Sequence, residues 1–430
     1  MGKTIAHFWP EFGAWLGGLE DTRDQTRITY SRQFLSWMGM MVFLLKLGSR
    51  RQVRFELDSP EALENINRLS HSSQETIAHG DTLDHFLSHV PPGQYAHLRR
   101  LMVHRLIRMK ALDGGRLYGH FLVVFDGTGQ LYFRQRHCPH CLTKTTDGKT
   151  QYYHHVLEAK IVTPDGLAIS VGSEFIENAD PNATKQDCEI KAFVRLARQL
   201  KKDFPQLMLC LCLDGLYAKG TVMDICQENH WKYFITFKEG SMPAVWKEYQ
   251  TLLELCPQNR KEHTMPQGVR QTYAWVDNLE YVDDRGHRQR FNAFQCAEQS
   301  GADKTLFAWI TNFTIRPDNV VALGNRGSRC RWKIENEGFN IQKNGGFNLE
   351  HAYSTGQWQI KNFYILLQIA HLMLQLLERS SLLGENCKRL FGSLRNLSKR
   401  LAESIRNHLI PIDALDTIAT ARIQIRMNSP

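Results

Sequence analysis

Two aspartates in this sequence directly follow runs of apolar residues. Residues 122–125 are apolar and end at Asp126, which precedes a glycine-punctuated turn at 127–129, and the apolar run 207–213 ends at Asp214. Such runs predict strands that are buried on both faces. Because burying a charge is costly, a carboxylate at the end of such a strand is expected to face outward from a rigid edge. The alternative for Asp126 is that it simply opens the turn.

A third acidic residue, Glu335, lies in a segment that predicts a helix. The apolar residues Trp332, Ile334 and Phe339 suggest one packed side, and the acidic residues suggest the other. Glu337 is a rival, but successive residues of an α-helix are about 100° apart, so Glu335 and Glu337 are expected on different faces. Glu335 is favoured because it directly follows the Trp332-x-Ile334 pair.

Two strand-end aspartates and one helical glutamate are suited to holding divalent cations. Mg²⁺ is typically bound by a few carboxylates and completes its shell with water and phosphate oxygens, and Mn²⁺ is an alternative. Two such ions about 4 Å apart stabilise the attacking and the leaving oxygen of a phosphodiester displacement. We therefore expect Asp126, Asp214 and Glu335 to bind two ions and to catalyse phosphoryl transfer.

A second group of residues predicts a structural zinc ion. A cysteine pair spaced x2 with a downstream histidine is typical of zinc sites, and a reducing compartment favours metal over disulfide. Adjacent residues of a strand point to opposite faces, so one of the two neighbouring histidines is expected to face away. The candidate ligands are Cys138, Cys141, His154 and His155, with His137 or His140 as alternates.

Length and composition limit the class of protein. The chain has 430 residues, 42% of them hydrophobic, a formal net charge of +9 and a pI near 9.0, which predicts two or three globular domains and fits a polyanionic partner. The alternative is a basic protein without such a partner. Ten scattered cysteines and no secretory leader predict a cytoplasmic chain. Residues 358–377 are long enough to span a bilayer, but polar residues interrupt them, so a buried amphipathic helix and no membrane are expected.

The order of the predicted elements indicates an α/β (α+β) fold with a mixed sheet flanked by helices. Within the first domain, the basic helix at 94–112 is a candidate DNA-binding element, or alternatively a solvated surface. The predicted domains are an N-terminal helical domain at 1–115, the first part of the core at 116–239, a β-rich insertion at 240–327, the C-terminal helices of the core at 328–379 and a basic helical tail at 380–430.

Taken together, these residues resemble those of bacterial insertion-sequence transposases of the DDE type, across about residues 120 to 380. Transposases with the signature Tyr-x2-Arg-x3-Glu-x6-Lys match in part. Arg331 and Glu335 keep their spacing, but Ser328 stands at the Tyr position and Gln342 at the Lys position, with Lys343 one residue later. The blocks that carry the resemblance are Asp126-Gly-Thr-Gly129, Cys138-Pro-His-Cys141, Tyr152-Tyr-His-His155, Lys185-Gln-Asp-Cys-Glu189 and residues 331–340.

The resemblance implies an RNase H-like fold, with Asp126, Asp214 and Glu335 as the metal-binding catalytic residues. It implies cleavage at the ends of the element, attack of the freed 3′-hydroxyl on target DNA, and a homodimer on double-stranded DNA in the bacterial nucleoid. Arg331 and Lys343 would contact phosphates, or would be ordinary surface charges.

Two alternatives to transposition stay open. They are an RNase H-like nuclease without strand transfer, and a catalytically inactive DNA-binding relative. Trp275 and Trp309 are candidates to stack on an unpaired base, although core packing is expected for both.

Overall fold

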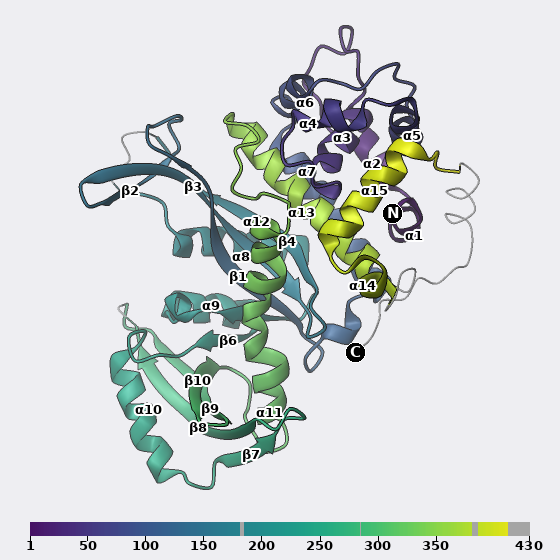
Figure 1. The fold of residues 1–430 in the computed structure, drawn as a ribbon. Coiled ribbons are helices and arrows are strands. Elements are labelled where there is room, and N and C mark those ends of the chain that lie inside the picture. The colour runs from purple at the N-terminus through teal and green to yellow at the C-terminus, as the bar shows by residue number, and fades with distance from the viewer. Residues whose placement is uncertain (181–184, 284, 381–385, 412–430) are drawn as a thin grey trace.

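The computed structural model describes residues 1–180, 185–283, 285–380 and 386–411. These residues form one large mixed β-sheet, with a bundle of helices gathered at one side and further helices along it, as Figure 1 shows, which confirms the predicted α+β class. Along the sheet the strands follow the order β2-β3-β1-β5-β6-β10-β9-β8-β7, and β4 also pairs with β3.

The middle of the sheet is built around β1. This strand is antiparallel to β3 and parallel to β5, and β5 is in turn parallel to β6. Its residues 121–125 are all buried, as expected for an apolar strand with neighbours on both sides. The bounds are β1 Phe121–Phe133, β2 Leu142–Thr146, β3 Lys149–Val162, β4 Ala168–Ile176, β5 Leu209–Leu213 and β6 Lys232–Thr236.

The prediction that the first strand ends at Asp126 is wrong. β1 continues through Asp126, Gly127 and Gly129 to Phe133, with a register shift between Gly129 and Leu131. The glycines therefore do not form a turn. A Cβ at Gly127 would lie 2.4 Å from His155 Nε2 and 2.7 Å from Glu189 Oε2, so glycine is needed here for close approach inside a strand.

The segment 240–327 extends the same sheet. The antiparallel neighbour of β6 is β10, which begins a meander of β10, β9, β8 and β7. Trp275 and Trp309 are buried in this half of the sheet, so both are core residues and neither offers a face to a base. The bounds are α10 Pro243–Leu255, β7 Arg260–Thr264, β8 Arg270–Val282, β9 Arg288–Ser300 and β10 Asp303–Thr311.

The N-terminal helices pack on the C-terminal helices of the core. Helix α3 lies against α13, and both are buried over almost their whole length. The helix α15 returns to α5, where the Asn65 side chain donates hydrogen bonds to the carbonyls of Ile405 and His408. The bounds are α1 Gly2–Phe8, α2 Phe12–Gly17, α3 Arg32–Leu44, α4 Gln52–Leu57, α5 Pro60–Ser70, α6 Gly80–Leu87, α7 Pro92–Arg108, α13 Gln357–Arg379, α14 Asn386–Phe391 and α15 Leu394–Asn407.

A buried polar network joins these helices to the sheet. The Glu158 side chain on β3 is fully buried and accepts a 2.9 Å hydrogen bond from Tyr364 on α13. Arg99 on α7 lies 3.9 Å from the same carboxylate and donates to Ser170 and Ser173 on β4. The N-terminal helices and the sheet consequently share one hydrophobic core and one charged network.

Helix α13 is the one helix among the described residues that is long and apolar enough to cross a membrane. Protein covers 94% of its most apolar window, which is the condition of a core helix and agrees with the expected buried amphipathic helix. In the predicted tail at 380–430, residues 381–385 and 412–430 lie outside the described residues.

Candidate functional site

Asp126 and Asp214 lie on neighbouring parallel strands. The register of β1 and β5 pairs Val124 with Cys212. Extending that register by two residues brings Asp126 alongside Asp214, the residue that directly follows β5. Asp214 caps the short 3₁₀ helix η2 (Gly215–Tyr217), and its Oδ1 accepts a 2.8 Å hydrogen bond from the Leu216 amide. The sheet therefore sets the spacing of the two aspartates.

Glu335 reaches the same region from a π-helix, η5 (Ile334–Asn340). Its Oε1 lies 2.8 Å from Arg331 Nη2, while Glu337 pairs with Lys333 at 3.7 Å. Ile334 and Phe339 are buried as predicted, but the expected packing of Trp332 is wrong, because half of this residue is exposed. The helical turn is wider than an α-turn, which shifts the face that each residue occupies.

Asp126 lies within electrostatic reach of Glu335. Burial, the largest cause, raises the pKa of Asp126 to about 7. Arg331 opposes this rise, whereas the negative charges of Glu335, Glu189 and Asp214 add to it. Because Glu335 is among the main charges that raise the pKa of Asp126, it remains the better candidate for the third carboxylate.

Glu189 is a fourth carboxylate at this site that sequence reasoning did not single out. It is the first residue of helix α8 (Glu189–Asp203), and its Oε1 accepts a 2.6 Å hydrogen bond from the Tyr217 hydroxyl. Burial, and then the charge of Asp214, raise its pKa, while the Tyr217 hydrogen bond lowers it. The sequence feature that could have indicated Glu189 is the block at 185–189, which ends at this residue and is one of the blocks that carry the resemblance.

The four carboxylates form a wide cluster. Among the described residues, the two groups of potential ligands whose donor atoms all lie within 4.8 Å of one another are elsewhere, at His137/Cys138/Cys141/His154 and at Asp224/Asp283/His287. Two ions about 4 Å apart, each about 2.1 Å from its ligands, would span roughly 8 Å between the outer carboxylates. An open group of carboxylates in which the pKa of the partly buried Asp126 is raised, mainly by burial, could hold ions only at such a spacing.

In the group Asp224/Asp283/His287, the Arg285 guanidinium already pairs with the carboxylates. Arg285 Nη2 lies 2.6 Å from Asp224 Oδ2 and 2.8 Å from Asp283 Oδ2, so this surface cluster is neutralised by the chain itself.

The candidate phosphate-binding residues lie beside the carboxylates. The Arg331 guanidinium is mostly buried and stacks 4.6 Å from the Trp332 ring. Lys343 pairs with Glu350 at 2.8 Å, and its charge adds to burial in lowering the pKa of His155. Both cations are therefore within electrostatic reach of the site.

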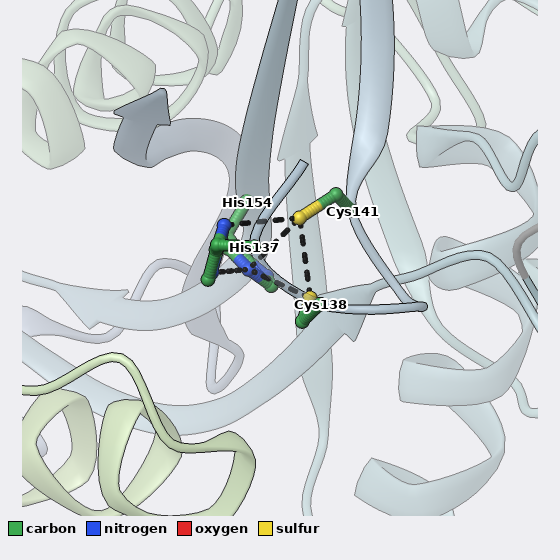
Figure 2. Close-up of side chains that lie close together, drawn as sticks. All are labelled: His137, Cys138, Cys141 and His154. Carbon is green, nitrogen blue, oxygen red and sulfur yellow. Dashed lines mark hydrogen bonds between the residues drawn. The ribbon is translucent and has the colours of Figure 1, made fainter. Parts of the chain in front are cut away.

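The cysteine pair lies in the turn after β1, and its partners differ in part from the prediction. His154 on β3 and His137 face the two sulfurs, as Figure 2 shows. His155 does not belong to this group, because it lies on the opposite face of β3 with its Nε2 4.0 Å from Glu189 Oε2. The alternate His140 hydrogen-bonds the Asn178 carbonyl instead.

The basic side chains of α7 are largely used inside the protein. Arg99 is buried, Arg100 pairs with Asp203 at 2.6 Å, and His104 contacts the Asp203 carbonyl. This face of α7 therefore packs on the core, and the cations that it leaves exposed are Arg108 and, just past its end, Lys110.

No protein-family model matches the chain, and no curated protein matches it.

Proposed function

We propose that this protein is a DNA transposase of the DDE type, which cuts phosphodiester bonds at the ends of a mobile element and joins the freed 3′-hydroxyl to target DNA. The observation that carries the proposal is the convergence of Asp126, Asp214 and Glu335 on one electrostatic site at the centre of the sheet. The blocks that carry the resemblance to insertion-sequence transposases include Asp126 and Glu335, and the resemblance implies Asp214 as the second aspartate.

Two Mg²⁺ or Mn²⁺ ions fit the donor set, because the carboxylates are hard oxygen ligands and repel one another without a cation. When bound, the ions would supply the positive charge that stabilises the attacking and leaving oxygens of the phosphodiester. Asp126 and Asp214 would hold them from two rigid strands, and Glu335 would close the site from η5.

The remaining residues of the site have separate roles in this proposal. Arg331 is placed to exchange its contact with Glu335 for a phosphate oxygen once a cation neutralises that carboxylate. Lys343 supplies a second charge for the DNA backbone, at the edge of the site. Glu189 adds negative charge beside Asp214 and holds Tyr217 in place.

The proposed partner is double-stranded DNA, both as element end and as target. The net charge of +9 favours a polyanion, and α15 exposes Arg395, Lys399 and Arg400. Two copies of the chain would act together on two element ends, in the bacterial cytoplasm and in association with the nucleoid.

The proposal is tested with purified protein and labelled DNA that carries element ends. Asp126→Asn, Asp214→Asn and Glu335→Gln should each reduce Mg²⁺-dependent cleavage by a factor of 10³ or more, on the order expected when a metal ligand is lost. DNA binding, measured by fluorescence anisotropy, should change little. Glu337→Gln is the matched control and should retain cleavage within a few-fold.

Survival of cleavage in both aspartate variants would overturn the metal site. Cleavage without joining of the 3′-end to target DNA would favour the nuclease alternative. DNA binding with no cleavage under any divalent ion would favour the inactive DNA-binding relative.

A further inference from the structure

We propose that His137, Cys138, Cys141 and His154 bind one Zn²⁺ ion that fixes the turn after β1 to strand β3. The four side chains come from two separate segments and point toward one another, as Figure 2 shows. Each residue offers one potential ligand atom, a histidine nitrogen or a cysteine sulfur, and these four atoms all lie within 4.8 Å of one another. None of the four residues is exposed.

The distances fit the edges of a coordination tetrahedron. Zinc bonds of about 2.0 Å to nitrogen and 2.3 Å to sulfur give edges of about 3.3 Å between nitrogens and 3.5 Å between nitrogen and sulfur. His137 Nε2 lies 3.2 Å from His154 Nε2, and Cys138 Sγ lies 3.5 Å from the same nitrogen. Cys141 Sγ lies 3.8 Å from it.

The two sulfurs are 3.2 Å apart, and both cysteines are free. This separation is well beyond the S–S bond of about 2.05 Å. It is about half an ångström shorter than the 3.8 Å edge of a zinc site, so binding would move the sulfurs slightly apart.

The type of donor selects the metal. Two thiolates and two imidazoles in a tetrahedral arrangement suit Zn²⁺, whereas Mg²⁺ and Ca²⁺ require oxygen ligands. The site would be closed, with four protein ligands and no position for substrate, which is the arrangement of a structural zinc ion.

The surroundings hold the donors in place. The Asn178 side chain donates a 2.9 Å hydrogen bond to the main-chain carbonyl of Cys141. The main-chain carbonyl of Asn178 lies 2.9 Å from His140 Nδ1, with which it forms a hydrogen bond. The Phe133 ring lies 3.8 Å from the His137 ring, centroid to centroid. Hydrogen bonds and packing thus support the ligand-bearing turn from outside the cluster, as is usual for metal sites.

The location of the cluster gives the ion a positioning role. His154 and His155 are consecutive on β3 and face opposite sides of the sheet. An ion that holds His154 also fixes the strand where His155 packs against Gly127 and Glu189. This positioning role rests on the proposed function, because it links the zinc site to the carboxylate site. The proposal that the four residues bind zinc does not rest on it.

The test is the metal content of the full chain, measured by mass spectrometry after purification without added chelator. We expect one zinc per chain, and substitution by Co²⁺ should give the intense near-ultraviolet absorption of cobalt–thiolate bonds. Cys138→Ser and His137→Gln should each lose the bound zinc. The matched control is Cys188→Ser, which changes an exposed thiol outside the cluster and should keep the zinc.

If a ligand variant fails to fold, the wild-type protein still decides the matter. Modification of its thiols with a mercurial should release one zinc per chain into a colorimetric chelator. Less than a tenth of an equivalent of zinc after refolding with excess Zn²⁺, or full zinc in Cys138→Ser, would overturn the proposal. Asp126→Asn should keep one zinc while losing cleavage, so failure of the zinc site and failure of the transposase proposal are separate outcomes.

Discussion

At the scale of single residues, Asp126 is the carboxylate of the candidate active site whose pKa is raised to about 7. Its carboxyl is partly buried near three other carboxylates, and Arg331 compensates them only in part. An arrangement that disfavours its own charge is typical of sites that bind a cation or transfer a proton. Because folding disfavours the charged form of Asp126, the stability of the protein should depend on pH.

We predict that Asp126 makes the metal-free protein less stable as the pH rises. Its pKa is 3.8 when unperturbed and about 7 in the folded protein. The folded state therefore binds the proton more tightly, and this contribution is complete below pH 4 and is lost as the pH rises through 7. By pH 8 the loss amounts to about 4 kcal/mol.

The measurement is chemical denaturation in EDTA between pH 5 and pH 8. Asp126→Asn, which imitates the protonated acid, should become progressively more stable than the wild type over this range. Added Mg²⁺ should stabilise the wild type but not the variant. A stability difference that does not depend on pH would contradict the assigned environment of Asp126.

The residues also show what the sequence could predict. Asp126, Asp214 and Glu335 could be proposed as site residues because each follows or joins an apolar pattern. Glu189 was not singled out, because an acidic residue that opens a helix is common and its role depends on Tyr217 and Asp214, which are distant in the chain. Likewise, the choice between His137 and His155 as partner of the cysteines depends on the path of the turn after β1.

At the scale of elements, β1 is unusual because it stays a strand through two glycines. Sequence reasoning predicted a turn there, since glycine usually marks turns. β1 stays paired with β3 past Asp126 as far as Phe133, and this pairing keeps the chain extended. Local signals could not reveal this, because the partner that enforces it lies in another segment.

We predict that Gly127→Ala disturbs the site through its contacts with His155 and Glu189. The added Cβ would lie under 3 Å from His155 and Glu189, both ends of side chains that can move. The variant should lose about 1–3 kcal/mol of stability through overpacking and should cleave DNA more slowly. Gly114→Ala is the control, because a Cβ there meets nothing within 4 Å.

The stability cost of Gly127→Ala can be traced to its contact by a double-mutant cycle. His155→Ala combined with Gly127→Ala should recover part of the stability that Gly127→Ala loses. Strict additivity of the two changes would show that the glycine is not needed for the approach of His155.

At the scale of the whole molecule, one sheet and one hydrophobic core extend across the segments that were predicted as separate domains. The segment at 240–327 adds its strands to the central sheet, and the helices of 1–115 share their core with α13. Composition and turn signals suggest where segments begin and end, but they do not show which apolar faces pack together. The mixed α+β class was predictable because it follows from the order of elements alone.

We predict that Glu158→Gln destabilises the entire molecule. Glu158 is fully buried and compensates Arg99 from α7 and Lys160 from its own strand. Removing one member of a buried charge network leaves the others uncompensated, at a cost of about 3–5 kcal/mol. Glu403→Gln, which breaks an exposed pair with Arg400, should cost less than about 1 kcal/mol.

Denaturant unfolding followed by circular dichroism and by tryptophan fluorescence measures both variants. The two signals should move together in Glu158→Gln, because the network spans α7, the sheet and α13. A change confined to one signal would indicate that the N-terminal helices unfold independently.

The contact between Asn65 and the carbonyls near the end of α15 closes a loop of 340 residues. During synthesis, α3 leaves the ribosome long before α13, the helix that covers it. At roughly 5–20 residues per second, the intervening roughly 300 residues take tens of seconds to make. Helices α2, α4, α5 and α6 also pack on α3, but the apolar side chains that it packs against α13 stay uncovered for that time, so the nascent chain should need chaperone protection until the C-terminal helices emerge.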